Sequence, residues 1–212
     1  MSNARLRSSM KTLSGFLLNE TTISNDATIN FGSSLITDDY DLYDVYVKNL
    51  IPATDDVSLQ LRLGVGGSLS TGASDYSTSM KMFGTKASDN GEHDTFSQAQ
   101  SSEIHLTVDS DQSLGTGDGE SWSARYRFYN LRSTTLIKGM EGLDSGGMTS
   151  NEYYSKLRNS QTINKYNVNR TSKVDTISIF ASSGNLTSGT ISLYGIKIWQ
   201  SYTNKWMVLK LN

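Results

Sequence analysis

The chain contains no cysteine and a single proline, Pro52. Without cysteine it has no disulfide framework, no thiolate zinc site and no cysteine nucleophile, so its stability must come from packing and from association with other chains. No apolar stretch of about 18 residues occurs, and the first 18 residues, MSNARLRSSMKTLSGFLL, lack the apolar run of a signal peptide. We therefore expect a soluble protein that is made in a cytoplasm and does not insert into membranes.

An excess of charge of either sign is also missing, because 19 Lys and Arg oppose 21 Asp and Glu and leave a net charge of −2. No basic field is available to attract nucleic acid, which we exclude as a partner. Hydrophobic residues (36%) and charged residues (19%) both fall below the globular average, and Ser, Thr, Asn and Gly take their place. Those residues favour turns and the outer faces of sheets over helix interiors.

Alternation of apolar and polar residues predicts strands at 21–31, 43–48, 57–65, 104–108 and 122–129, the first with a turn or bulge at Asn25 and Asp26. The clearest is 57–65, where Val57, Leu59, Leu61, Leu63 and Val65 share one face. Near the C-terminus, 174–198 reads VDTISIFASSGNLTSGTISLYGIKI, two alternating halves around a turn, and we interpret it as a long β-hairpin on which the other strands close.

The segments 66–102 and 139–173 show little alternation and are interpreted as long polar connections, the second with one weak strand, while 199–211 offers a last strand pair. About eight strands with no convincing internal helix predict an all-β fold. We expect an antiparallel two-sheet β-sandwich of the jelly-roll type, covering residues 21–212.

Residues 1–20 differ in character from the rest. Leu6, Met10, Leu13 and Leu17 follow one another at spacings of four, three and four, which would line one face of a short helix. We interpret the segment as an N-terminal arm that anchors the domain on a neighbouring chain through these four residues. The alternative is a terminus that packs on its own sheet.

No catalytic constellation stands out, so we expect a non-enzymatic protein. The two histidines, His93 and His105, are interpreted as surface residues. Ser68, in the stretch Gly-Ser-Leu-Ser at 67–70, lacks the second glycine of a nucleophile elbow. No pair of carboxylates is singled out for glycoside hydrolysis, because spacing along the chain does not determine spacing in space.

The acidic loop from Asp109 to Glu120 resembles an EF-hand loop in part. It fails as one because Leu114 occupies the sixth position, where the turn requires glycine, and because strands flank it. A looser calcium site made of Asp109, Asp111, Asp118 and Glu120 is one interpretation, and a solvated acidic loop without a cation is the other. No further cofactor is expected.

Tyrosines outnumber what a single core needs. Those expected on loops or outer faces are Tyr40, Tyr46, Tyr76, Tyr129, Tyr153, Tyr154 and Tyr194. Such rings can stack on sugars or on partner proteins while their hydroxyl groups hydrogen-bond. We select Tyr76, Tyr129, Tyr153 and Tyr154 as the candidate ligand surface. The alternative is that several tyrosines cover sheet edges or subunit contacts.

Three stretches carry a resemblance to a known family: TTISNDATINF at 21–31, YDLYDVYVKNLIPATDDVSLQLRLGVGGS at 40–68, and 174–198. They resemble a family of small virion proteins from tailed bacteriophages, particularly marine ones, most specifically over 182–196. The resemblance implies a structural or adhesive role on the particle surface, in a tail appendage or fibre, or as capsid decoration. It implies other virion proteins as partners and transfers no catalytic residue.

Assembly of such proteins through symmetric contacts predicts a homo-oligomer, a trimer or larger. The main alternative function is a carbohydrate-binding adhesin that recognises a glycan on the host surface. A third alternative is a glycan-degrading enzyme.

Overall fold

The computed structural model describes residues 14–86, 89–107, 113–117, 119–146, 157–166 and 171–198. Over these ranges the chain is all-β: it forms thirteen strands in two sheets, and every strand pairing is antiparallel. No helix occurs among these residues, and so none that is long and apolar enough to cross a membrane.

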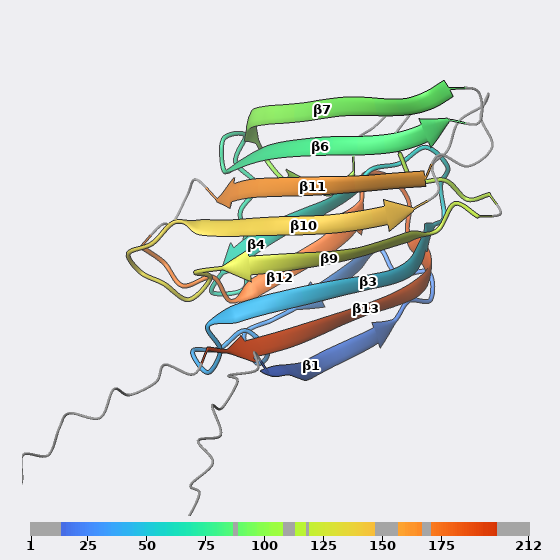
Figure 1. Ribbon diagram of the computed structural model, residues 1–212. Helices are drawn as coiled ribbons and strands as arrows, with labels where there is room; N and C mark the ends of the chain where they lie inside the picture. Colours follow the sequence, from blue (N-terminus) through green and yellow to red (C-terminus); the bar gives the residue numbers. More distant parts are fainter. Residues whose placement is uncertain are drawn as a thin grey trace, which may run out of the picture.

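The larger sheet has eight strands and forms the broad front layer of Figure 1. In order across the sheet they are β1 (Ser14–Thr22), β13 (Leu186–Lys197), β3 (Leu42–Pro52), β9 (Trp122–Tyr129), β10 (Lys138–Gly146), β11 (Leu157–Tyr166), β6 (Tyr76–Lys86) and β7 (Asp89–Ser101).

The smaller sheet lies behind the larger one in Figure 1. Its strands are, in order, β2 (Thr28–Phe31), β12 (Thr176–Ala181), β4 (Leu59–Val65) and β5 (Ser68–Leu69), while β8 (Ile104–His105) also pairs with β4.

One hydrophobic core joins the two sheets. Alternate residues of β3 (Tyr43, Val45 and Val47) are buried in the same cluster as alternate residues of β4 (Leu59 and Leu61). Because successive side chains of a strand point to opposite faces, the residues between them in β3 lie on the outer face of the larger sheet. That face carries the candidate site.

The expected closing hairpin is wrong, although both of its strands exist. β12 pairs with β2 and β4 in the smaller sheet, whereas β13 pairs with β1 and β3 in the larger one. The chain therefore crosses from one sheet to the other at 182–185 instead of folding back on itself. A hairpin and such a crossing share the same alternation and the same turn residues, so the local pattern does not distinguish them.

The expected first strand, 21–31, is two strands in different sheets. β1 ends at Thr22 and β2 begins at Thr28, with Asn25 between them in a left-handed conformation (φ 63°). β1 begins at Ser14, so the boundary placed between an arm of 1–20 and a domain of 21–212 is wrong. The last seven residues of that arm form part of an edge strand, not a helix.

Both long polar segments contain more strands than expected. The first holds β5 and the hairpin of β6 and β7, and the second, with the residue before it, holds β10 and β11. In contrast, the expected strand at 104–108 is reduced to the two residues of β8. The predicted strand pair at 199–211 lies outside the described residues.

Candidate functional site

The outer face of the larger sheet carries two parallel rows of side chains that run across its strands. Strand register places Glu20, Ser192, Tyr46, Arg125 and Leu143 opposite one another on β1, β13, β3, β9 and β10. Neighbouring strands lie about 4.8 Å apart, so this first row extends over roughly 19 Å. It brings together residues from five strands that are far apart in the chain.

The second row crosses the same five strands two residues further along β3 and consists of Leu17, Tyr194, Asp44, Arg127 and Glu141. Arg127 donates two hydrogen bonds to Asp44, from Nε to Oδ1 and from Nη2 to Oδ2, both at 2.7 Å. The hydrogen bonds and charge of Asp44 raise the pKa of the Arg127 guanidinium, so the two groups form a persistent ion pair.

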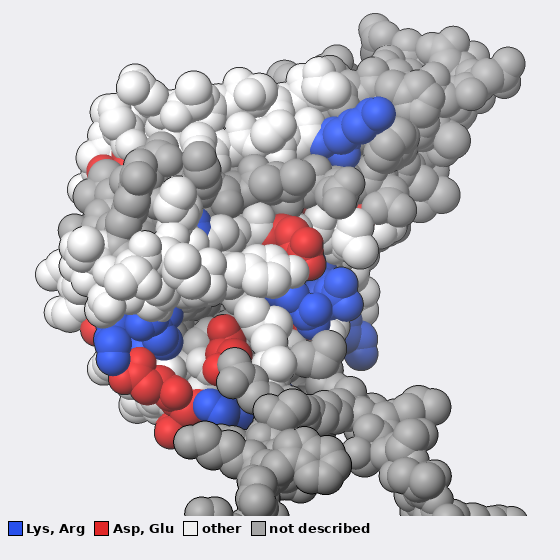
Figure 2. Space-filling model, turned by 60° about the vertical axis from the view of Figure 1, so that its left-hand side comes forward, with Lys and Arg blue, Asp and Glu red and all other residues white. Residues whose placement is uncertain are grey.

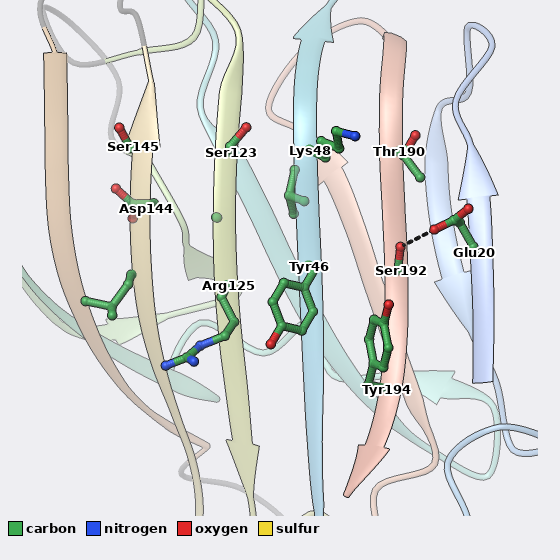
Figure 3. A pocket seen from close by; sticks show the side chains of 13 residues that line it. Glu20, Tyr46, Lys48, Ser123, Arg125, Asp144, Ser145, Thr190, Ser192 and Tyr194 are labelled. Atoms are coloured by element: carbon green, nitrogen blue, oxygen red, sulfur yellow. Dashed lines mark hydrogen bonds between the residues drawn. The ribbon is translucent and has the colours of Figure 1, made fainter. Parts of the chain in front are cut away.

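A groove of about 730 Å³ opens along the first row. Figure 3 shows Tyr46, Arg125, Ser192 and Tyr194 projecting from three neighbouring strands on its floor. A second hollow of about 330 Å³ shares Tyr46 and Tyr194 with it, so the two hollows adjoin at this aromatic pair. An extended ligand could therefore lie across the strands.

Tyr46 and Tyr194 form the aromatic centre of these two hollows. Their rings meet edge to face, with centroids 5.2 Å apart and an interplanar angle of 73°. Tyr46 is 40% exposed even so, and it lines the groove. Edge-to-face contact restricts the ring without covering it, and this preorganises an aromatic surface for a ligand.

Polar groups surround the aromatic pair. At one end Ser192 Oγ donates to Glu20 Oε2 (2.9 Å), and Lys48 and Thr190 lie alongside (Figure 3). At the other end lies Arg125, which makes no ion pair with the side chains that the structure describes. The groove thus offers both hydrogen-bond donors and acceptors.

Acidic and basic side chains lie interspersed on the side of the molecule shown in Figure 2. The charged residues in and beside the groove balance in the same way, since Arg125 and Lys48 are opposed by Glu20 and Glu141 on the outer face. No large field of one sign is available to attract a polyanion or a polycation.

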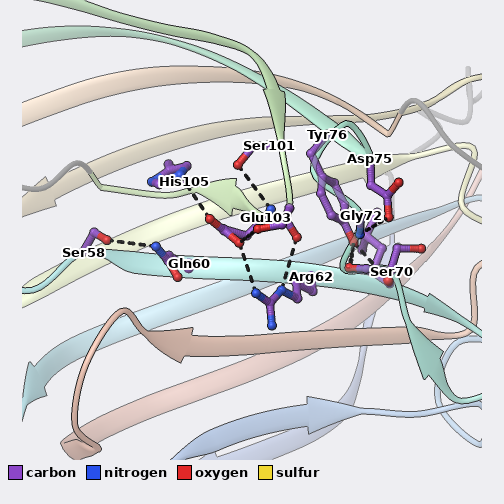
Figure 4. A network of polar contacts seen from close by, with 12 residues as sticks. Ser58, Gln60, Arg62, Ser70, Gly72, Asp75, Tyr76, Ser101, Glu103 and His105 are labelled. Atoms are coloured by element: carbon purple, nitrogen blue, oxygen red, sulfur yellow. Dashed lines mark hydrogen bonds and ion pairs between the residues drawn. The ribbon is translucent and has the colours of Figure 1, made fainter.

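A second polar cluster, shown in Figure 4, lies next to β4 of the smaller sheet. Glu103 lies 3.1 Å from Arg62 Nη2 and 3.6 Å from His105 Nε2, and it accepts a short hydrogen bond from Ser102. Burial raises the pKa of Glu103, but the hydrogen bonds from Ser102 and Arg62 outweigh burial and hold it below its usual value. This cluster ties β8 to β4, and we assign it a structural role.

The candidate ligand tyrosines are not brought together. Tyr76 is fully buried, with its hydroxyl bonded to the backbone of Leu63 and Ser70, so its place on a ligand surface is wrong. Tyr129 lies on the outer face beyond the second row, where its hydroxyl donates to Glu141 Oε1. Burial and this carboxylate raise the pKa of Tyr129. Tyr153 and Tyr154 lie outside the described residues.

The structure describes only some of the residues predicted for the anchoring arm and for the calcium site. Leu17 is 54% exposed on β1, while Leu6, Met10 and Leu13 lie outside the described residues, as do Asp109, Asp111 and Asp118. Glu120 accepts a hydrogen bond from the Gly117 backbone N–H (2.6 Å). Among the described residues no three His, Asp or Glu side chains form a group that could hold a metal ion.

Sequence reasoning expected Tyr46 and Tyr194 on loops or outer faces but did not select them, or Arg125, as the candidate ligand surface. Alternation places Tyr46 and Arg125 on the outer faces of their strands, and that is the only signal that the sequence carries for them. Their proximity depends on the pairing of β3 with β9, which joins segments nearly 80 residues apart.

Comparison of the chain with models of known families, with curated proteins and with solved structures found no match in any of the three.

Proposed function

We propose that the protein is a non-enzymatic structural protein of a tailed-bacteriophage virion, exposed on the particle surface and attached through protein–protein contacts. The resemblance at 21–31, 40–68 and 174–198 supports this proposal, as do the topology and one edge of the larger sheet. In this proposal the fold is a β-sandwich of the jelly-roll type, an architecture common in viral capsid proteins.

The strand pairing supports a jelly roll because it is nested. β1 pairs with β13, β2 with β12, β3 with β9 and β4 with β8, so the first strands pair with the last and inner strands with inner ones. Such a set corresponds to one long antiparallel ribbon. Rolling the ribbon up adds the contacts of β13 with β3 and of β12 with β4, and both are present. The remaining long strands, β10, β11, β6 and β7, widen one sheet.

The observation that carries the attachment role is the edge formed by β1. Among the strands that the structure describes, β1 ends the order of the larger sheet, and such an edge offers N–H and C=O groups for pairing with another chain. Phe16 and Leu17 on it are 49% and 54% exposed. The same end of the chain carries Leu6, Met10 and Leu13, so backbone and apolar side chains would act together in one contact.

Deletion of residues 1–13 tests this role, because it removes the proposed anchor and keeps all of β1. We expect the truncated protein to retain its β-sheet circular dichroism and to be absent from gradient-purified particles, as judged by immunoblot. Leu17→Lys should weaken incorporation in the same direction, whereas Leu136→Lys, at a 55% exposed leucine outside the sheets, should not. Full incorporation of the truncated protein would overturn the attachment role.

A second candidate function, a carbohydrate-binding adhesin, is favoured by the groove with its exposed Tyr46. The disposition of its carboxylates favours binding over hydrolysis. Glu20 and Asp144 lie on strands four places apart, roughly 19 Å, whereas the carboxylates of a glycosidase lie at most about 10 Å apart. Asp44 and Glu141 are closer, but Arg127 occupies both oxygens of Asp44.

A further inference from the structure

We propose that the groove on the outer face of the larger sheet binds a neutral glycan chain laid across the strands, with a sugar ring stacked on Tyr46. This inference rests on the second candidate function and names its ligand class and its contact residues. It assigns binding to Tyr46, Arg125, Ser192 and Glu20, and not to Tyr76 or Tyr129.

Tyr46 has the exposure and position of a stacking residue. Its ring lies in the middle of the first row, with Ser192 opposite on one neighbouring strand and Arg125 opposite on the other. The contact with Tyr194 holds the ring in place, and Tyr46 lines the groove with 40% of the residue exposed. The apolar face of a sugar ring can cover such a surface while the tyrosine hydroxyl stays available for hydrogen bonding.

The flanking groups match the hydroxyl groups of sugars, each of which can donate and accept. Arg125 presents only donors and Glu20 presents only acceptors, while the hydroxyl of Ser192 donates its hydrogen to Glu20 and can accept one from a ligand. Hydrogen bonds to ionised partners are about twice as strong as those between neutral groups. Because these residues lie on both sides of Tyr46, a chain that runs along the row would be held on either side of the stacked ring.

The balance of charge selects a neutral glycan over an acidic one. On the outer face Arg125 and Lys48 are matched by Glu20 and Glu141, and Arg127 in the second row is already paired with Asp44. A polyanion would gain little and would meet the carboxylate of Glu20. A protein partner fits less well, because the centres of protein interfaces are depleted in Lys and Glu, whereas Lys48 and Glu20 line this groove.

The test uses the full-length protein in affinity electrophoresis through gels that contain dextran, mannan or laminarin as neutral probes, or alginate as an acidic probe. We expect retardation by at least one neutral polysaccharide, insensitive to added salt. Tyr46→Ala should weaken this binding about tenfold, as expected for loss of one aromatic anchor. Arg125→Ala should weaken it in the same direction, and Tyr46→Phe should retain most of it.

Leu136→Ala is the matched control, because it truncates an exposed side chain away from the groove, and it should bind like the unmodified protein. Thermal unfolding of every variant separates loss of binding from loss of fold, with Tyr46→Phe and Arg125→Ala available if Tyr46→Ala unfolds.

Neutral-glycan binding that none of the groove variants changes would overturn the groove assignment and leave the adhesin function standing. If the protein bound only alginate, and added salt abolished that binding, the proposal that the ligand is a neutral glycan would be overturned. No retardation by any probe would overturn both this inference and the adhesin function, and would leave the virion role untouched.

Discussion

Arg127 and Asp44 lie directly opposite each other on β9 and β3 and form a bidentate ion pair on the outer face of the larger sheet. The Asp44 side chain is 3% exposed and that of Arg127 is 21% exposed. The pair therefore joins two central strands of the sheet while it borders the proposed binding groove.

Removal of Arg127 should destabilise the fold, because it leaves the buried Asp44 carboxylate without its ion-pair partner. We expect Arg127→Met to lower the free energy of unfolding by on the order of 2 kcal/mol, less than the roughly 3–5 kcal/mol of a fully buried pair, since water reaches the guanidinium. Urea denaturation measures the change. The double variant Asp44→Asn with Arg127→Met should recover part of the loss, and additive losses would show that the two residues are not coupled.

Tyr76 is expected to act as a buried structural residue. Its hydroxyl accepts the Leu63 N–H at 2.9 Å, so Tyr76→Phe leaves that buried donor without this partner. We expect a loss of about 1–3 kcal/mol in the free energy of unfolding and no change in glycan retardation. Tyr194→Phe, in the groove, is the comparison and should alter stability by about 0.5 kcal/mol or less. Equal stabilities of the two variants would contradict the assignment.

Gly189 should not tolerate a side chain. It has a φ of 122°, and a Cβ there would lie 2.9 Å from the Asn49 carbonyl oxygen on β3. Gly189→Ala should therefore cost about 1–3 kcal/mol in thermal or chemical unfolding. Gly32→Ala is the control, because a Cβ at Gly32 meets no atom within 4 Å, and it should change stability by about 0.5 kcal/mol or less. Similar losses of stability in Gly189→Ala and Gly32→Ala would argue against backbone strain at Gly189.

The Glu103 cluster should contribute stability that depends on pH. Since the pKa of Glu103 in the folded protein is below the ordinary 4.5, its contribution is complete above about pH 4.5 and is lost as the pH falls through the folded value. Glu103→Gln should thus lower the melting temperature near neutral pH, with the difference from the unmodified protein shrinking in acid.

His105 also lies next to Glu103, with Nε2 3.6 Å from Oε1, so the experiment is repeated in a His105→Gln background. The shrinking difference should persist in that background. A constant difference from neutral to acid pH would show that the Glu103 carboxylate is not the source of the effect.

Alternation predicted the strands that bury one face fully. The residues 43–48, 57–65 and 122–129 correspond to most of β3, β4 and β9, and the core positions Val45, Leu61 and Tyr126 follow from the same pattern. These strands lie against the shared core, where burial selects apolar residues at every second position.

Of the four strands that extend the larger sheet, the sequence predicted only one weak strand, within 139–173. β6 and β7 lie at its far edge, where Met80 is buried in a small cluster with Phe96, separate from the main core. Backbone hydrogen bonds help to hold such strands in the sheet whatever their side chains are. Segments rich in Ser and Thr can therefore form strands without a periodic pattern in the sequence.

The sequence by itself determined that the protein is all-β and which residues of the core strands point inward, because alternation is a local property of extended backbone. Only the tertiary structure decided which strands are neighbours. β12 and β13 adjoin in the chain and lie in different sheets, whereas Tyr46 and Tyr194 come from distant segments and touch. Pairing is decided by the burial of all strands together in one core, and no local stretch of sequence carries that information.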